Sequence, residues 1–161
     1  MTQAAILDDK PAEGTGTYKN YVTFLVDDRV YAVDIQLVRE IKQWSPTTVL
    51  PNQPHYTRGV LNLRGTIVPV HDLRARFGGE LTDTTENNVI VIVNIGEQTV
   101  GVLVDAVSDI VTVSTDEIRP VPATVSDYEA TTISGLVNTE AHMVALIDLP
   151  ALFPAQANMA G

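Results

Sequence analysis

The chain has 161 residues, of which 45% are hydrophobic and 19% charged, so it has the length and composition of a globular domain and not those of a disordered chain. It contains no cysteine, which excludes a disulfide framework, a zinc ribbon, an iron–sulfur cluster and a cysteine nucleophile. Its formal net charge of −10 argues against nucleic acids and anionic membrane surfaces as partners, because both are bound through an excess of lysine and arginine.

The two ends of the chain differ in composition from its middle. Residues 1–17 predict a flexible arm and residues 154–161 a flexible tail, whereas residues 18–153 predict a single folded domain. The many Val, Ile and Thr residues favour strands. No apolar run approaches the ~18 residues of a membrane span, and no basic segment precedes an apolar stretch at the N-terminus. We therefore expect a cytoplasmic protein that does not insert into a membrane.

Four pairs of β-rich segments are separated by short turn sequences, which is the pattern of β-hairpins. Asp27-Asp28, Arg64-Gly65 and Gly96-Glu97 form three of the predicted turns. The paired segments are Tyr21–Val26 with Arg29–Val33, Gly59–Leu63 with Thr66–Val70, Val89–Ile95 with Thr99–Val104, and Ile133–Val137 with Met143–Ile147.

Three segments predict short helical turns, because their apolar residues recur at three- and four-residue spacing. They are Ile35–Ile41, Asp72–Phe77 and Asp148–Phe153. Asp72 and Asp148 begin two of these segments, so we interpret both carboxylates as helix N-caps rather than as catalytic groups.

The sequence contains an internal repeat. Residues 59–73 (GVLNLRGTIVPVHDL) align without a gap with residues 135–149 (GLVNTEAHMVALIDL) and share five identities. Upstream, VREI at 38–41 matches VSDI at 107–110. A period of about 70 residues is longer than that of a solenoid.

The two copies span about residues 20–80 and 88–153, with about five strands in each. Such copies predict a mostly β fold made of two similar small barrels with short helices, because closure hides the edges of a five-stranded sheet. The repeat leaves open whether strands are exchanged between the barrels. The groove where two barrels meet is a natural docking site for a partner.

Motifs that carry known chemistry are missing. The sequence has no G-x-S-x-G, GxxxxGK[ST], G-x-G-x-x-G or HExxH motif. His55, His71 and His142 lie too far apart in sequence to supply two metal ligands from one element. The acidic pairs, such as Asp27-Asp28, lack the apolar setting that would raise one pKa. We expect no enzyme activity, no catalytic residue, no cofactor and no metal.

Two aromatic residues, Trp44 and Tyr56, flank a proline-rich segment. They could line a ligand cleft together with His71 or His142, or they could plug the end of a barrel, which is the commoner role of single amphipathic aromatics. A small ligand-binding β-barrel therefore stays as an alternative function.

A few charged residues interrupt apolar runs. Arg39 and Glu40 lie inside LVREIK, and Arg64 follows the apolar run GVLNL at a tight turn. Glu40 and Arg64 have opposite charge, so they could form an ion pair that braces the surface or could each be solvated separately.

The charge is divided unevenly along the chain. Residues 1–76 hold nine Lys and Arg and eight Asp and Glu, whereas residues 77–161 hold Arg119 and twelve acidic residues. The second repeat also has Glu140-Ala141 where the first has Arg64-Gly65. These differences predict that the two barrels serve different partners.

Four motifs in order make the chain resemble the CheW family of bacterial chemotaxis coupling proteins: VREI, LP-x-x-P, G-V-x-N-L-R-G-x-x-x-P-V-x-D-L and VG-x-L-V-D-A-V. The resemblance covers residues 18–153 and implies two SH3-like five-stranded β-barrels. It implies an adaptor without enzyme activity, which bridges the cytoplasmic tips of methyl-accepting chemoreceptors and the regulatory domain of a CheA-type histidine kinase in membrane-proximal arrays.

Carried over by position, the family's receptor-contacting surface near the groove between the barrels includes Val38, Glu40, Gly59, Asn62 and Arg64. The residues that contact the kinase are not assigned. The same resemblance admits a CheW-like regulatory module of a kinase or of a CheV-type protein, although the start methionine and the predicted terminal arms favour a complete adaptor.

Overall fold

The structure is a computed structural model that describes residues 17–122, 132–139 and 142–153. The predicted tail and all but one residue of the predicted arm lie outside this range. The exception is Thr17, whose backbone N–H donates to Oγ1 of Thr115 at 3.1 Å, so regular hydrogen bonding begins at the last residue assigned to the arm.

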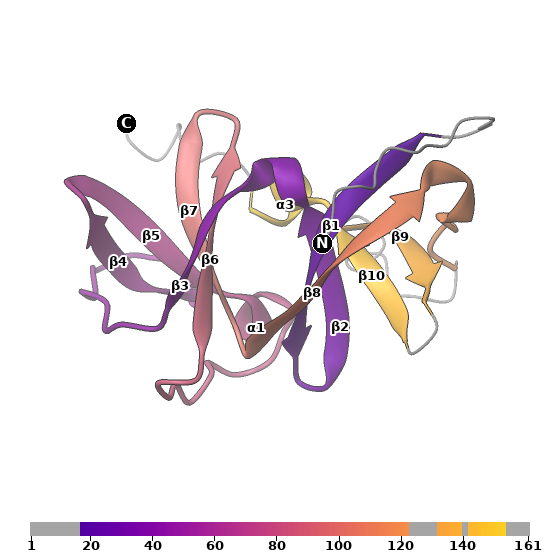
Figure 1. Cartoon of the computed structure of the whole chain (residues 1–161). Coiled ribbons are helices and arrows are strands. Elements are labelled where there is room, and N and C mark those ends of the chain that lie inside the picture. The colour runs from indigo at the N-terminus through magenta and orange to yellow at the C-terminus, as the bar shows by residue number, and fades with distance from the viewer. Residues whose placement is uncertain (1–16, 123–131, 140–141, 154–161) are drawn as a thin grey trace.

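Within the described residues the chain forms ten strands and four short helical turns (Figure 1). The strands are β1 (Tyr18–Val26), β2 (Arg29–Asp34), β3 (Val38–Gln43), β4 (Thr57–Leu63), β5 (Thr66–Asp72), β6 (Val89–Ile95), β7 (Gln98–Val104), β8 (Ala106–Ser114), β9 (Ile133–Asn138) and β10 (Met143–Ile147). The helical turns are η2 (Ile35–Leu37), α1 (Leu73–Arg76), η3 (Thr115–Glu117) and α3 (Leu149–Leu152).

The four predicted hairpins are confirmed by the pairing of β1 with β2, β4 with β5, β6 with β7, and β9 with β10. Two of them turn through residues with positive φ at both central positions. These are Asp27 (52°) with Asp28 (68°), and Arg64 (51°) with Gly65 (91°). Positive φ at both positions is the geometry of a type I′ turn, whose twist matches that of the flanking strands.

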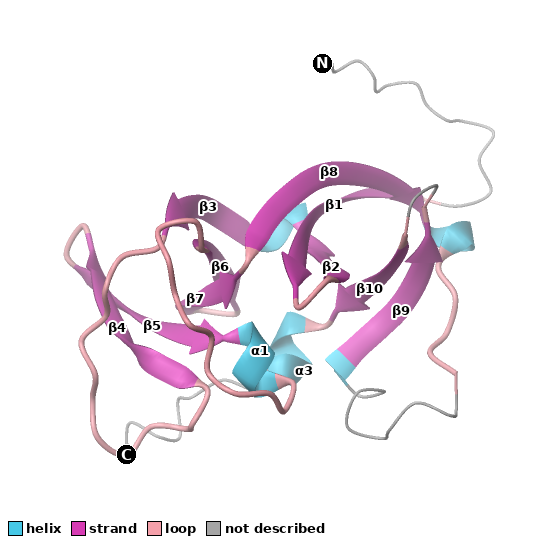
Figure 2. Cartoon of the chain, turned by 90° about the horizontal axis from the view of Figure 1, so that it is seen from below, coloured by secondary structure: helices cyan, strands magenta, loops and turns pink. Residues whose placement is uncertain are grey.

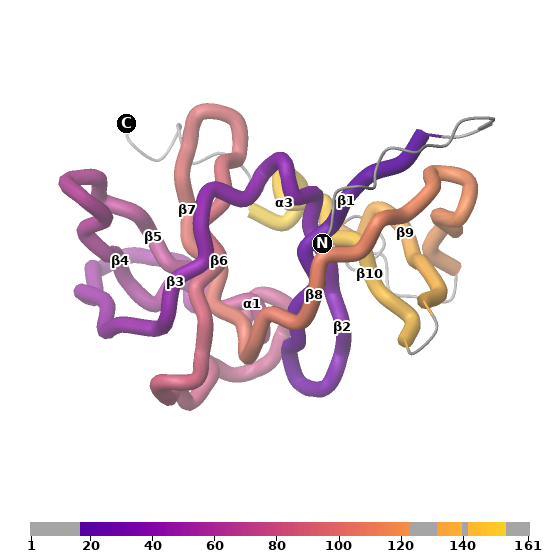
Figure 3. The backbone as a smooth tube through the Cα atoms, in the orientation of Figure 1, coloured from indigo at the N-terminus to yellow at the C-terminus, as the bar shows by residue number. Residues whose placement is uncertain are grey.

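The strands form two five-stranded sheets, as predicted, but neither sheet corresponds to one repeat. One sheet, called barrel 1, has the order β8-β1-β2-β10-β9, and the other, called barrel 2, has the order β3-β6-β7-β5-β4. Each barrel takes strands from both repeats. The two orders are equivalent, because each strand of barrel 1 occupies the place that its repeat counterpart, five strands away in the numbering, occupies in barrel 2. The chain crosses between the barrels after β2 and again after β7 (Figure 3).

Each sheet is closed by one short antiparallel bridge. In barrel 2 the bridge joins Thr48, in the segment that follows β3, to Val60 of β4, with both N···O distances 2.9 Å. In barrel 1 the bridge joins Arg119, which follows β8, to Leu136 of β9, at 2.8 and 2.9 Å. The two bridges occupy equivalent positions in the repeats, so the duplication extends to the way the barrels close.

The hydrophobic core has three parts, one inside each barrel and one between the barrels. Along β6, Ile90 and Ile92 belong to the cluster inside barrel 2, whereas Val91 and Val93 belong to the cluster between the barrels. The central strands are thus buried on both faces, which explains why they are continuously apolar. The cluster between the barrels is called the junction cluster here.

The helices α1 and α3 lie between the two sheets (Figure 2). Arg76 of α1 donates from Nε to the carbonyl oxygen of Leu152 in α3 at 2.7 Å. Asp72 and Asp148 cap these helices by accepting from the backbone N–H groups of Ala75 (3.3 Å) and Ala151 (3.2 Å), which confirms both predicted N-caps.

One predicted helix was too long. Only Ile35–Leu37 form a helical turn, and Val38–Gln43 form the strand β3 instead of continuing the helix to Ile41. The apolar spacing suggested a helix because the chain changes direction after Leu37, so that apolar residues of two different elements fall at helical intervals. Within β3 itself, half-buried and exposed residues alternate with the period of two that a strand requires.

Candidate functional site

The strand β3 is an edge strand of barrel 2 and carries two of the predicted site residues on opposite faces. Val38 pairs with Val93 of β6 and faces the junction cluster. Glu40 pairs with Ile92, which lies inside barrel 2, and therefore points the other way. The change of face is produced by a β-bulge between Val38 and Glu40, which inserts Arg39 into the strand.

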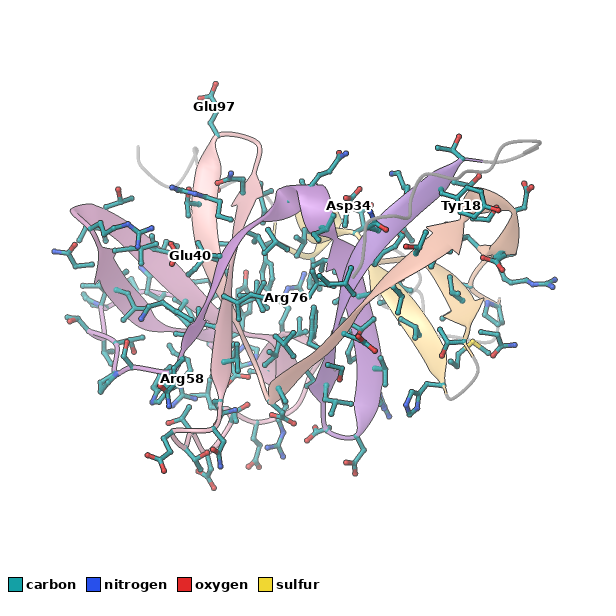
Figure 4. The ribbon with its side chains drawn as sticks, viewed as in Figure 1. Tyr18, Asp34, Glu40, Arg58, Arg76 and Glu97 are labelled. Atoms are coloured by element: carbon teal, nitrogen blue, oxygen red, sulfur yellow. The ribbon has the colours of Figure 1, made fainter. Side chains whose placement is uncertain are left out.

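On the barrel 2 side, Glu40, which is labelled in Figure 4, forms an ion pair with Arg64 of the β4–β5 turn. Arg64 belongs to the turn between β4 and β5, so this contact joins the two edge strands of the sheet. The hydrogen bond from the Arg64 guanidinium lowers the pKa of Glu40, and the same bond raises the pKa of Arg64. The ion pair considered from the sequence is confirmed, and it spans the gap at which barrel 2 closes.

Two further predicted residues support this closure. The side-chain oxygen of Asn62 accepts from the backbone N–H of Gly65 at 2.8 Å, which fixes the turn that presents Arg64. Gly59 has a φ of 146°, and a Cβ at this position would overlap the carbonyl oxygen of Thr48. Glu40, Gly59, Asn62 and Arg64 are called the closure cluster below.

On the opposite face of β3 the structure reveals an apolar surface that includes only one predicted site residue. Val38 and Ile41 on β3, and Val107 and Ile110 on β8, lie on the faces of their strands that continue the junction cluster. Ile41 is 45% exposed and Ile110 is 59% exposed. These four residues are called the seam. Isoleucine side chains exposed at such levels beside a buried cluster are available to contact a partner.

The structure thus divides the predicted residues between two surfaces of β3. Glu40, Asn62 and Arg64 are brought together in the closure cluster. The strand β4, which carries Asn62, lies at the side of barrel 2 away from barrel 1 (Figure 1). Val38 lies in the seam. Ile41 and Ile110 were not among the predicted site residues. The match of VREI with VSDI contained the signal, but the segment that holds Ile41 was assigned to a helix.

A buried polar network in barrel 2 was also missed. Asp72 is fully buried and, besides capping α1, accepts from the backbone N–H and Oγ1 of Thr82 at 2.7 and 2.9 Å. Arg58 donates to the same carboxylate at 3.1 Å and stacks over the ring of Trp44, with its guanidinium carbon 5.4 Å from the ring centre. The network fixes the segment after α1 against barrel 2. Nothing in the spacing of Arg58 and Thr82 indicated it.

Trp44 and Tyr56 pack in different places and do not line a common cleft. Trp44 packs against the cluster inside barrel 2, as the barrel-plugging interpretation predicts. Tyr56 packs against the junction cluster and contacts His71 and Phe153, with ring centres 5.2 and 5.8 Å away. Burial lowers the pKa of His71 to about 4, and its Nδ1 lies 3.0 Å from Oγ1 of Thr57. The neutral imidazole of His71 is therefore a packed core group.

A hollow of about 510 Å³ lies on barrel 1, among β2, β9 and β10. Its lining includes Tyr31, Phe77, His142 and Met143. Of the residues considered for ligand binding, His142 is the one that lines it. Within residues 17–122, 132–139 and 142–153, no group of three or more histidine and acidic side chains is arranged to hold a metal ion. In the same ranges, no helix is both long enough and apolar enough to cross a membrane.

The two barrels differ in charge, although by less than the two halves of the sequence. Barrel 2, residues 35–104, carries six basic and six acidic side chains. The described residues of barrel 1 carry three basic and eight acidic side chains, because strand exchange brings Asp27, Asp28 and Asp34 into the same barrel as the acidic β8 region. Glu140-Ala141, which replace the charged turn of the first repeat, lie outside the described residues.

Comparison with known proteins agrees with this architecture. The family model described as a CheW-like domain matches residues 20–157. A chemotaxis protein CheW from Rhizobium meliloti is 40% identical over 138 residues, which cover 86% of this chain and 89% of the relative. A probable chemotaxis protein CheW from Rhizobium etli is 42% identical over 135 residues, covering 84% and 87%. The crystal structure of the scaffolding protein TtCheW from Thermoanaerobacter tengcongensis is 32% identical, with a TM-score of 0.78 and coverage of 86% and 94%.

Proposed function

The chain belongs to the CheW family of chemotaxis proteins, and we propose that it couples the cytoplasmic tips of chemoreceptors to a CheA-type histidine kinase through protein contacts alone. The similarity to chemotaxis proteins and to a scaffolding protein over nearly the whole folded region supports an adaptor role. In this role the protein catalyses no reaction and works in receptor arrays at the cytoplasmic side of the membrane.

The observation that carries the proposal is the seam. A receptor tip is a helical hairpin, and an amphipathic helix binds by placing apolar side chains on an apolar surface. Ile41 and Ile110 project from two different barrels beside one continuous buried cluster, so a hairpin could contact both at once. Exposed isoleucines supply affinity in such an interface, and charged residues at its rim supply register.

The closure cluster is the second part of the proposed receptor surface. Glu40 and Arg64 pair at the edge of barrel 2, and the Arg64 side chain is 65% exposed, so it can contact a partner while it remains paired. Val38, Glu40, Gly59, Asn62 and Arg64 together remain the predicted receptor-contacting set, with Ile41, Val107 and Ile110 added. We expect Glu40→Lys and Arg64→His to weaken receptor binding while the chain stays folded.

The charge difference between the barrels supports separate surfaces for two partners. Barrel 2 is balanced in charge, whereas barrel 1 is acidic, so the two barrels attract different surfaces. An adaptor needs such separation, because it has to bind the receptor and the kinase at the same time. The regulatory domain of the kinase is the proposed second partner, and its contact residues are not assigned.

A calorimetric titration of the chain with a fragment of a chemoreceptor cytoplasmic tip tests the receptor half of the proposal. We expect saturable binding that Ile41→Asp and Ile110→Asp each weaken at least tenfold, because a carboxylate would be desolvated in an apolar contact. Met143→Asp is the control, since Met143 is 54% exposed on β10, away from both the seam and the closure cluster. Equal affinity of all three variants and the unsubstituted chain would contradict the proposal.

A further inference from the structure

The strand β3 carries its charged side chains on the face away from the seam. Glu40 and Lys42 pair with two isoleucines of β6 that belong to the cluster inside barrel 2. Arg39, at the bulge, donates from Nη1 to Oγ1 of Thr99 at 3.4 Å. Thr99 precedes the junction residue Val100 on β7, so it lies on the same side of the sheet as those isoleucines. All three charges of β3 are thus turned away from the apolar residues of the seam.

The charged residues of β8 and of its neighbour β1 also face away from the seam. Asp109 of β8 pairs with Thr23, which lies between the junction residues Val22 and Phe24 and therefore points the other way. Lys19 of β1 pairs with a valine of β8 that belongs to the cluster inside barrel 1. These two strands have no other charged residue. The seam side of β1, β3 and β8 therefore carries no charged side chain.

Neutral hydrogen-bonding groups border the seam instead. Thr112 lies next to Ile110 on the same face of β8, and its hydroxyl donates to Oδ1 of Asn20 on β1 at 2.7 Å. Thr112 and Asn20 are both exposed. None of the contacts among the described residues involves the amide nitrogen of Asn20. This nitrogen can therefore donate to an oxygen atom of a partner that lies on the seam.

We propose that the seam binds a helical hairpin whose contact face carries no charge, and that Asn20 donates a hydrogen bond to a neutral oxygen on that face. This inference rests on the proposed function and names the chemistry of the partner surface. A charged group laid on the seam would lose its water without meeting an opposite charge, which is costly. A neutral carbonyl or hydroxyl oxygen beside the apolar contacts is paired by Asn20, so the seam discriminates against helices with charged contact faces.

A second copy of this chain also offers an uncharged seam. The net charge of −10, however, makes two copies repel one another. A hairpin of different charge meets no such repulsion, so we assign the hairpin as the occupant.

A calorimetric titration with a chemoreceptor tip fragment tests the role of Asn20. Asn20→Asp keeps the oxygen that accepts from Thr112, but it replaces the amide donor with a negative charge. We expect binding to weaken roughly tenfold, because the carboxylate would be desolvated beside the seam, and we expect the midpoint of urea unfolding to stay unchanged. The matched control is Asp109→Asn, the reverse exchange on the opposite face of the same strand pair, which should leave the affinity unchanged.

The salt dependence of binding tests the absence of charge contacts at the seam. The charged residues of the proposed receptor surface are those of the closure cluster, so any difference in affinity between about 50 and about 500 mM NaCl should be lost in Arg64→Gln. The fragment is titrated at both salt concentrations into the unsubstituted chain and into Arg64→Gln.

The outcomes separate this inference from the proposed function. Unchanged or tighter binding by Asn20→Asp, or a salt dependence that persists in Arg64→Gln, would overturn the inference. The proposed function would still stand if Ile110→Asp weakened binding in the same assay. Failure of the unsubstituted chain to bind the fragment, or a dimer of the free chain that excludes the fragment, would overturn both.

Discussion

The two barrels have equivalent strand orders but differ in the hydrogen bonds and ion pairs made by their helix-capping carboxylates. Asp72 and Asp148 occupy equivalent positions and cap equivalent helices. In barrel 2 the carboxylate of Asp72 is fully buried and also holds Thr82 and Arg58, whereas Asp148 is only half-buried. The position equivalent to Arg58 in the second repeat is Ser134, whose hydroxyl donates to the carbonyl oxygen of Leu146 at 3.3 Å.

This difference shows which of the duplicated features are needed to form a barrel. The apolar pattern, the helix caps and the closing bridges occur in both repeats, and they are sufficient to define both barrels. The arginines do not recur, since Arg39 and Arg58 correspond to Ser108 and Ser134. Basic residues are therefore the part of the repeat that has diverged, which is consistent with two barrels that contact different surfaces.

The largest difference between the barrels is expected from removing their cap carboxylates. Asp72→Ala leaves the Arg58 guanidinium without its buried partner and should lower the free energy of unfolding by about 4 kcal/mol. Asp148→Ala removes only a helix cap and should cost about 1 kcal/mol. Urea unfolding followed by circular dichroism measures both values, and equal losses would contradict the different roles assigned to the two carboxylates.

The closing bridges offer a second comparison. Gly59→Ala should cost about 3 kcal/mol, because the new Cβ meets the backbone of Thr48 and φ is positive. Gly135→Ala should cost less, about 2 kcal/mol, because its φ is not positive, although the new Cβ meets Cγ2 of Ile118 at 2.5 Å and the carbonyl oxygen of Arg119 at 3.2 Å. A smaller loss for Gly59→Ala than for Gly135→Ala in urea unfolding would show that the bridge in barrel 2 is not the tighter one.

Acidification should destabilise the packing around His71. Because burial lowers its pKa to about 4, the unfolded chain binds a proton more readily than the folded chain between pH 6.5 and 4. This group's contribution is complete above pH 6.5 and is lost as the pH falls, by about 2 kcal/mol between pH 7 and pH 5. His71→Asn, which retains a polar atom for Thr57, should remove this part of the pH dependence. The free energy of unfolding, measured against pH for both chains, checks this, and parallel curves would exclude a contribution from His71.

The smallest effect on stability is expected at the ion pair of Glu40 with Arg64. The side chain of Arg64 is largely exposed, so Glu40→Gln should leave the midpoint of urea unfolding nearly unchanged. The pKa of Glu40 is lowered, so the stabilisation by the pair is present at neutral pH and is lost as the pH falls below the usual range of a glutamate. A large loss of stability in Glu40→Gln at neutral pH would show that the pair holds barrel 2 closed.

Much of the fold could be predicted because it is encoded locally. The turn Arg64-Gly65 and the caps Asp72 and Asp148 depend on neighbouring residues, and the repeat reinforced the assignment of the two caps. The strand β3 could not be recognised, since it is short, follows directly on η2 and carries charged residues at an edge.

Features that depend on distant parts of the chain could not be derived in the same way. The exchange of strands between barrels depends on which hairpins pair in space, and two equal repeats are compatible with either arrangement. The ion pair of Glu40 with Arg64 could be considered because the two charges are opposite, but the contact of Arg58 with Asp72 had no such indication. The seam became visible only when β3 and β8 were placed on the same side of the junction cluster.

The central claim is that one molecule binds a receptor tip and the kinase together. Sedimentation velocity of the chain mixed with a chemoreceptor tip fragment and the regulatory domain of a CheA-type kinase tests it most directly. We expect one ternary species whose amount falls with Ile110→Asp while the complex with the kinase domain persists. Two binary complexes that exclude one another, or no complex with either partner, would contradict it.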